Sequence, residues 1–113
     1  MQTFSIAIHG GAGTLVKGMM TSELEAAYKA ALKLALDAGY SILEKGGTSV
    51  EAVEKAVIVL EDSYLFNAGK GAVFTADETH EMDASIMSGE NLNAGAVSLI
   101  SGIKNPISLA RDV

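Results

Sequence analysis

A histidine followed by three glycines within four residues, His9-Gly10-Gly11-Ala12-Gly13, is the segment of the sequence best suited to chemistry. Glycines let backbone amides approach a ligand or a neighbouring chain closely, because no Cβ stands in the way. Such a turn could form an oxyanion hole, hold a phosphate group, or only pack against another part of the fold. The spacing matches neither Gly-x-Gly-x-x-Gly nor a Gly-Lys-Ser/Thr nucleotide loop. The residues alone therefore leave these three uses open.

The other polar side chains do not form a complete catalytic set. His80, Glu81 and Asp83 could be metal ligands by residue type, but neighbouring positions on a strand point to opposite faces. We interpret them as the polar edge of a half-buried strand. The chain contains no cysteine and no Gly-x-Ser-x-Gly turn, and its loop hydroxyls stand where helix caps are expected. The pattern predicts a binding loop without a nucleophile.

Composition and charge narrow the possible partners. The 113 residues include 14 acidic and 8 basic side chains, which give a formal charge of -6. This charge repels phosphate backbones and anionic lipid headgroups, so we expect neither nucleic acid nor a membrane as a partner. No run of the sequence approaches the roughly 20 apolar residues of a transmembrane helix. A chain without cysteine suits a reducing compartment, and we expect a cytoplasmic location.

Apolar periodicity places a strand and two helices in the first half of the chain. The alternation of Phe4, Ile6 and Ile8 with smaller or polar residues predicts a strand that leads into the glycine-rich segment. Each of the two helices is expected to begin with a capping box and to carry an apolar stripe at helical spacing. The helices are expected from Ser22 to about Lys45, with the cap pair Ser22 and Glu25, and from Thr48 to Leu60, with the cap pair Thr48 and Glu51.

The second half of the chain is predicted to form a loop, short strands and a final helix. Residues 61–71 lack periodicity and contain two glycines, which indicates a structured loop. Strands are expected over 72–75, 80–87 and 94–103, and the last is apolar enough to be covered on both faces. Asn105-Pro106 supplies an N-cap and a first-turn proline for a helix. Because the few residues that follow cannot hold a helix alone, we expect residues 1–113 to be the front part of a longer fold.

Five segments, in order, resemble the plant-type (type III) L-asparaginase and isoaspartyl peptidase family. They are His9 to Gly13, Leu60 to Phe74, Glu81 to Met87, Ala94 to Val97, and Asn105 to Arg111. Together they span essentially the whole chain, so the match is more specific than a short motif. The resemblance implies an α+β fold, part of the four-layer αββα sandwich of N-terminal-nucleophile hydrolases. Residues 1–113 would then be a single partial domain of the α subunit, completed by a β subunit.

The resemblance also implies an activity. Members of the family hydrolyse L-asparagine to L-aspartate and ammonia, and they hydrolyse β-aspartyl (isoaspartyl) dipeptides. They mature by cutting themselves before a threonine, which then heads the β subunit and uses its own free amine to activate its hydroxyl. The subunits assemble as an (αβ)2 heterotetramer. The family's cleavage signature, Gly-Thr followed by Val-Gly, does not occur here, so the resemblance implies no catalytic residue in this chain.

Supporting residues follow from the resemblance by position. His9, Gly10, Gly11 and Gly13 match a loop that lies beside the nucleophile, and Asn67 matches an asparagine close to the catalytic threonine. A second loop matches one that wraps Na+, or K+, through main-chain carbonyls, and no organic cofactor is implied. Here these carbonyls would be those of Leu60, Glu61, Ser63, Phe66, Ala68 and Lys70. Carbonyl oxygens suit a hard cation.

Two other interpretations share these sequence features. One is a relative with another substrate, such as a glycosylasparaginase or a threonine aspartase. The other is a stand-alone α+β binding module that has kept the loops without the hydrolase. A second polypeptide headed by threonine would distinguish an enzyme subunit from a module. The choice between asparagine and β-aspartyl peptides depends on side chains outside residues 1–113.

Overall fold

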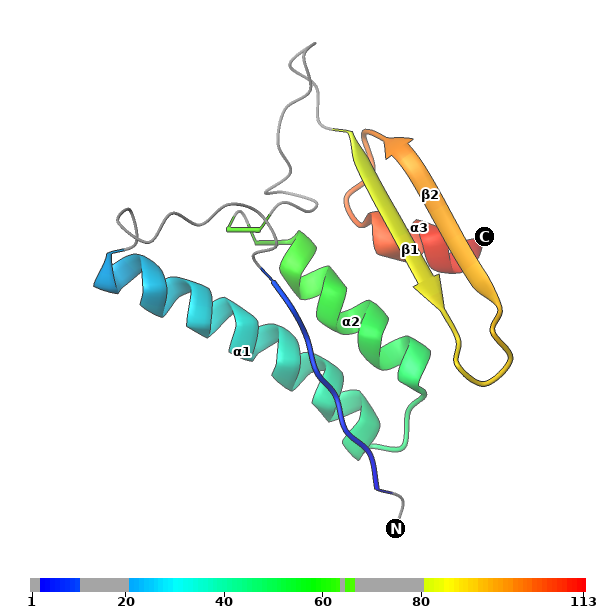
Figure 1. Cartoon of the computed structure of the whole chain (residues 1–113), viewed down its shortest axis with the longest axis horizontal. Helices are drawn as coiled ribbons and strands as arrows, with labels where there is room; N and C mark the ends of the chain where they lie inside the picture. Colours follow the sequence, from blue (N-terminus) through cyan, green and yellow to red (C-terminus); the bar gives the residue numbers. More distant parts are fainter. Residues whose placement is uncertain (1–2, 11–20, 64, 67–80) are drawn as a thin grey trace.

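Two long helices lie side by side, next to a two-stranded antiparallel sheet that carries a short helix on one face (Figure 1). The computed structural model describes residues 3–10, 21–63, 65–66 and 81–113. Within these residues the mixture of helices and strands confirms the predicted α+β class. The four-layer sandwich stays a prediction.

Helix α1 spans Ser22–Glu44 and begins one residue earlier than its predicted cap implies. The Leu24 amide donates to the hydroxyl oxygen of Thr21 at 3.0 Å, so Thr21 is the N-cap. The predicted capping box of Ser22 and Glu25 is therefore wrong. The reason is local, because Thr21 has the extended backbone that an N-cap needs while Ser22 is already helical.

Helix α2 spans Ser49–Glu61 and begins with the predicted pair. The Glu51 amide donates to the Thr48 hydroxyl oxygen at 3.1 Å. In turn, the Thr48 hydroxyl donates to the Glu51 carboxylate at 3.0 Å. The pair is confirmed, with the carboxylate bound to the hydroxyl instead of the backbone. Between the helices Gly46 has a φ of 86°, a conformation that favours glycine after a helix end.

Small side chains at their contact allow α1 and α2 to approach closely. The buried residues there are Ala35 and Gly39 on α1 and Ala52 and Ala56 on α2. A Cβ on Gly39 would lie 3.0 Å from the carbonyl oxygen of Ala52 and 2.6 Å from Cδ1 of Ile6. The helix pair and the segment that contains Ile6 thus meet at this glycine.

The N-terminal segment crosses the helix pair in extended form (Figure 1). Phe4, Ile6 and Ile8 are its less exposed residues, in the predicted alternation. The rings of Phe4 and Tyr40 meet edge to face, with 5.1 Å between their centroids. Within the described residues the sheet has only two strands, and this segment is not one of them. The predicted periodicity is confirmed, but the segment is extended chain and not the predicted strand, because it pairs with no strand among the described residues.

Strands β1, Met82–Met87, and β2, Ala94–Ile100, form an antiparallel hairpin. Its turn is closed by the Ser88 amide, which donates to the Asn93 carbonyl at 2.9 Å. In β1 the alternate residues from Met82 are the less exposed ones, as predicted. The predicted strand 72–75 and residue His80 lie outside the described residues.

The second strand is shorter and more exposed than the sequence predicts. It ends at Ile100, which pairs with Met82, the first residue of β1, instead of at residue 103. The register shifts just before this pair, between Met82 and Ala84. There Leu99 takes a φ of 52°, and its amide donates to the Asp83 carboxylate at 2.8 Å. The prediction that both faces are covered is also wrong for the described residues, since Ala94, Ala96 and Ser98 are exposed.

Helix α3, Pro106–Asp112, packs on the other face of the hairpin. Its closest approach is at Gly95 of β2, where a Cβ would collide with the carbonyl group of Ala110. The buried residues Pro106, Ile107 and Ala110 form its inner side. The predicted helix start at Asn105-Pro106 is confirmed.

Replacing Gly95 tests this contact. We expect Gly95→Ala to lower the free energy of unfolding of the intact protein by about 1–3 kcal/mol, because the helix backbone must move away from the strand. Gly89→Ala is the matched control, since a Cβ at Gly89 meets nothing within 4 Å. The measurement is thermal unfolding of the two variants beside wild type. Equal melting temperatures for both variants would contradict the close packing described here.

Candidate functional site

The start of the glycine-rich segment lies over helix α2. His9 and the three residues before it line one side of an apolar pocket of about 210 Å³. The other side of this pocket is formed by α2. The lining residues are Ile6, Ala7, Ile8 and His9 from the segment and Val53, Ala56, Val57 and Leu60 from α2. The fold thus brings His9 to the C-terminal half of α2, where the predicted cation loop begins.

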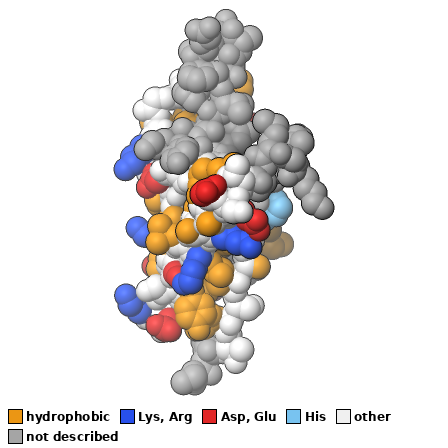
Figure 2. Space-filling view, turned by 90° about the vertical axis from the view of Figure 1, so that its left-hand side faces the viewer, with side chains coloured by type: hydrophobic (Ala, Val, Ile, Leu, Met, Phe, Trp, Pro, Cys, Tyr) orange, Lys and Arg blue, Asp and Glu red, His pale blue; other side chains and the backbone are white. Residues whose placement is uncertain are grey.

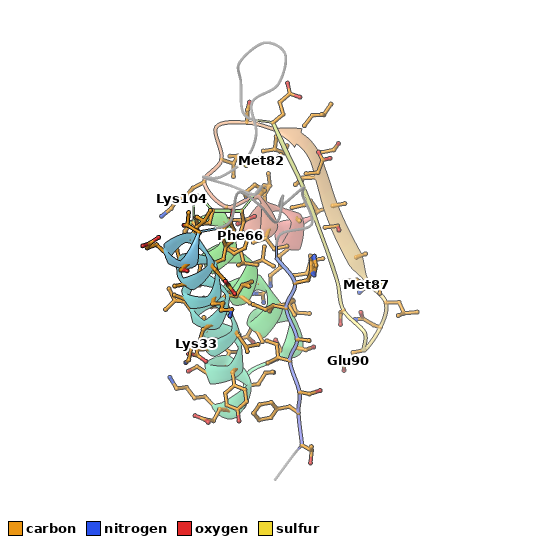
Figure 3. All side chains as sticks on the ribbon, turned by 60° about the vertical axis from the view of Figure 1, so that its left-hand side comes forward. Lys33, Phe66, Met82, Met87, Glu90 and Lys104 are labelled. Carbon is orange, nitrogen blue, oxygen red and sulfur yellow. The ribbon has the colours of Figure 1, made fainter. Side chains whose placement is uncertain are left out.

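Gly10 contacts that loop directly. A Cβ on Gly10 would lie 2.6 Å from Cε1 of Phe66 and 2.9 Å from Cδ2 of Leu32. Phe66 is 5% exposed, and its ring meets the ring of Tyr28 edge to face with 5.6 Å between centroids. Figure 3 shows Phe66 close to the helix pair. The structure therefore brings two loops together that are more than fifty residues apart in the sequence.

Glu61, the last residue of α2, is 3% exposed, and its carboxylate reaches helix α3. Its Oε1 accepts a hydrogen bond from Nδ2 of Asn105 at 3.1 Å, and its Oε2 accepts one from the Ile107 amide at 3.0 Å. Asn105 makes no cap bond with its own side chain, so Glu61 supplies an acceptor that the first turn of α3 requires. Nδ2 of Asn105 also lies 3.1 Å from Oδ1 of Asp62.

Burial dominates the electrostatics of Glu61. It raises the pKa of the Glu61 carboxyl above its usual value, and the hydrogen bonds from Asn105 and Ile107 offset part of this effect. The neighbouring carboxylates of Asp62 and Glu54 raise the pKa further. A buried carboxylate in this position depends on its donors, and both come from the start of α3.

Comparison with known proteins assigns the chain to a family. Residues 1–113, the whole chain, match the family model described as Asparaginase. The chain belongs to the asparaginase family. It is 53% identical over 106 residues to an isoaspartyl peptidase/L-asparaginase of Xenopus laevis. It is 48% identical over 106 residues to an isoaspartyl peptidase of Escherichia coli K12, and 50% identical over 110 residues to a plant-type L-asparaginase of Pyrococcus abyssi.

These three matches cover 94%, 94% and 96% of this chain. They cover 33%, 33% and 34% of the relatives, so the chain spans about a third of the length of the curated relatives it matches. The family predicted from the sequence is confirmed.

The described part of the predicted cation loop contains backbone carbonyls, which are the donors that the predicted ion would need. Leu60 and Glu61 end α2, where backbone carbonyls lack helical donors and the helix dipole is negative. The Ser63 amide donates to the Leu60 carbonyl at 3.2 Å, which leaves that oxygen a second lone pair. Phe66 is buried beside Gly10. Ala68 and Lys70 lie outside the described residues.

Side-chain ligands for a metal are not assembled in the described part of the chain. No group of three or more His, Cys, Asp or Glu side chains comes together there. Both oxygens of Glu61 accept from protein donors, and Asp83 accepts from the Leu99 amide. Asp83 is thus a structural residue of the hairpin, in agreement with the interpretation of its sequence as the edge of a strand.

Gly11, Gly13 and Asn67 lie outside the described residues, so their roles stay predictions. The described helices include none that is long and apolar enough to cross a membrane. On the face shown in Figure 2, acidic and basic side chains lie interspersed instead of forming a block of one sign.

Sequence reasoning missed the link between Glu61 and α3. A signal for it exists, because Glu61 and Asp62 place two carboxylates at the C-terminal end of α2. Negative charge is unfavourable at that end of a helix. Such carboxylates need donors from elsewhere in the fold. The sequence gives no direct indication that Asn105 and Ile107 supply them.

Substitution at Gly10 tests the contact between the two loops. We expect Gly10→Ala to destabilise the intact protein by about 1–3 kcal/mol, because the new methyl group displaces the Phe66 ring. A matched double variant, Gly10→Ala with Phe66→Leu, should recover part of the loss, since the smaller side chain makes room. Thermal unfolding measures both. A double variant less stable than wild type by the full sum of the two single-variant effects would contradict this contact.

Proposed function

We propose that residues 1–113 are the front part of the α subunit of an amidohydrolase that cleaves L-asparagine and β-aspartyl dipeptides. The observation that carries the proposal is the match of the whole chain to the asparaginase family. The names of its relatives, isoaspartyl peptidase and L-asparaginase, support these two substrate classes. The contact of Gly10 with Phe66 supports a role for this chain in shaping a site.

In the proposed reaction, the nucleophile is the threonine that heads a β subunit. Its free amine takes the proton of its hydroxyl, and the hydroxyl oxygen attacks the carbonyl carbon of the side-chain amide. The bond to nitrogen breaks, and ammonia or the amine of the dipeptide leaves with a proton. Water then hydrolyses the ester to release L-aspartate. The proposed nucleophile arises by self-cleavage of a precursor, and the proposed assembly is a cytoplasmic (αβ)2 heterotetramer.

The residues of this chain would support that site instead of performing the chemistry. His9 and Gly10 would hold the glycine-rich segment beside the nucleophile, with Phe66 packed behind Gly10. The carbonyls of the loop over residues 60–70 would hold Na+ or K+. The ion would supply a fixed positive charge that holds the loop in one shape, and no organic cofactor is part of the proposal.

A hydrolysis assay tests the proposed activity. We expect the intact, matured protein to hydrolyse a β-aspartyl dipeptide and L-asparagine, and residues 1–113 alone to hydrolyse neither, because the nucleophile is missing. Mass spectrometry should find a second chain that begins with threonine. Hydrolysis of a glycosylated asparagine in preference to both substrates would instead favour a glycosylasparaginase. Activity of residues 1–113 alone would contradict the subunit assignment.

Two variants test the loops within that assay. We expect Asn67→Ala to lower turnover because it changes the surroundings of the nucleophile. Gly11→Val should block maturation, because its side chain fills space that the backbone needs. Gly89→Ala is the control, since a Cβ at that turn meets nothing within 4 Å. Full maturation and activity in both loop variants would show that these positions do not serve the site.

Cation exchange tests the loop itself. Replacing Na+ by tetramethylammonium at constant ionic strength should lower the melting temperature of the intact protein, because a ligand that binds only the folded state stabilises it. A divalent-metal chelator should have no effect in the presence of Na+. Destabilisation by the chelator, restored by a divalent ion, would contradict the carbonyl site.

A further inference from the structure

Glu61 has two structural roles, one for its main chain and one for its side chain. Its main-chain carbonyl belongs to the proposed cation loop, and its side chain accepts from Asn105 and Ile107. These donors lie 44 and 46 residues away in the sequence. Both carboxylate oxygens are used, and Glu61 is 3% exposed.

We propose that Glu61 is a positioning residue that couples cation binding by the loop to the seating of α3 and its hairpin. This inference rests on the proposed function, because it needs the carbonyl site for Na+ or K+. In this proposal the Glu61 side chain is not a ligand of the cation. It affects cation binding by holding the loop over residues 60–70 in one shape.

The carboxylate of Glu61 is held rigidly. Two hydrogen bonds from different residues, at 3.1 Å and 3.0 Å, fix both its position and its plane. Few rotamers of Glu61 satisfy both donors, so the backbone of Glu61 is restrained with its side chain. A cation held by carbonyls needs those oxygens in a particular arrangement. The donors on α3 thus restrain one of the proposed ligands.

Helix α3 is itself fixed to the hairpin. It has only seven residues, too few to be stable without tertiary contacts. It packs on β2 at Gly95, where there is no room for a Cβ. Moving α3 would therefore move the hairpin with it, and Glu61 is the point at which this unit meets the loop.

A second contact between α2 and α3, an ion pair, provides a control for the test. Nη1 of Arg111 on α3 lies 2.8 Å from Oε1 of Glu54 on α2. This ion pair also holds α3 against α2, but Glu54 is two turns before the end of α2 and outside the loop. If α3 holds Glu61 in the shape that binds Na+, loosening Glu61 lowers the affinity for Na+ by the same factor by which bound Na+ favours the seating of α3, because coupling is reciprocal. Loss of the Glu54 pair should only lower stability.

The test is a Na+ titration of the melting temperature of the intact protein, with tetramethylammonium chloride holding the ionic strength constant. The readout is the dissociation constant for Na+, obtained by fitting the rise in melting temperature with Na+ concentration to binding by the folded state alone. A merely structural residue lowers the melting temperature at every concentration and leaves this dissociation constant unchanged. The variants are Glu61→Gln and Asn105→Ala, with Glu54→Gln as the matched control.

We expect Glu61→Gln and Asn105→Ala to raise the dissociation constant for Na+ about tenfold, and Glu54→Gln to change it by less than about twofold. Asn105→Ala removes one donor and keeps the carboxylate, so it carries the test if Glu61→Gln fails to fold. Dissociation constants within about twofold of wild type in Glu61→Gln and Asn105→Ala would overturn the proposal, as would an equal shift in Glu54→Gln.

Wild type separates failure of this proposal from failure of the proposed function. A wild-type protein that hydrolyses the β-aspartyl dipeptide but shows no Na+-specific rise would refute the cation loop, and the coupling with it. A Na+-dependent rise without hydrolysis would refute the activity and leave the coupling to be decided by the variants.

Discussion

A buried carboxylate at the C-terminal end of a helix is the constraint on which the arrangement of this chain depends. Negative charge is disfavoured there by the helix dipole and by the loss of water. Glu61 is stable in this position because Asn105 and the Ile107 amide donate to it. The same bonds satisfy the first turn of α3, which has no side-chain cap of its own. This contact thus stabilises both the C-terminal end of α2 and the N-terminal end of α3.

Close backbone approach is the second organising feature, and it depends on glycine at a few positions. Gly10 admits the ring of Phe66, and Gly95 admits the backbone of α3. Each contact joins segments distant in sequence, so a single added methyl group would separate two parts of the fold. In an asparaginase-family chain this explains why glycines stand outside turns as well as in them.

The sequence predicted what depends on neighbouring residues and missed what depends on distant ones. The Thr48 and Glu51 pair and the start of α3 follow from local spacing. Thr21 and Ser22 could not be distinguished as N-cap, because adjacent hydroxyls give the same pattern. The exposure of β2 depends on what packs on it, and the Glu61 link spans 44 residues. Of the candidate site, the family could be anticipated from the five segments that resemble it, whereas the contact of Gly10 with Phe66 could not.

The long separation between Glu61 and its donors has a consequence for the order in which the chain folds. Helices α1 and α2 are joined by a short turn, so their contact closes a small loop at little entropic cost. Docking of α3 requires closure over more than forty residues and a completed hairpin to pack against. Local contacts form faster than distant ones. We therefore expect the helix pair to form first during synthesis, while Glu61 is still exposed to water. Glu61 becomes buried only when α3 docks.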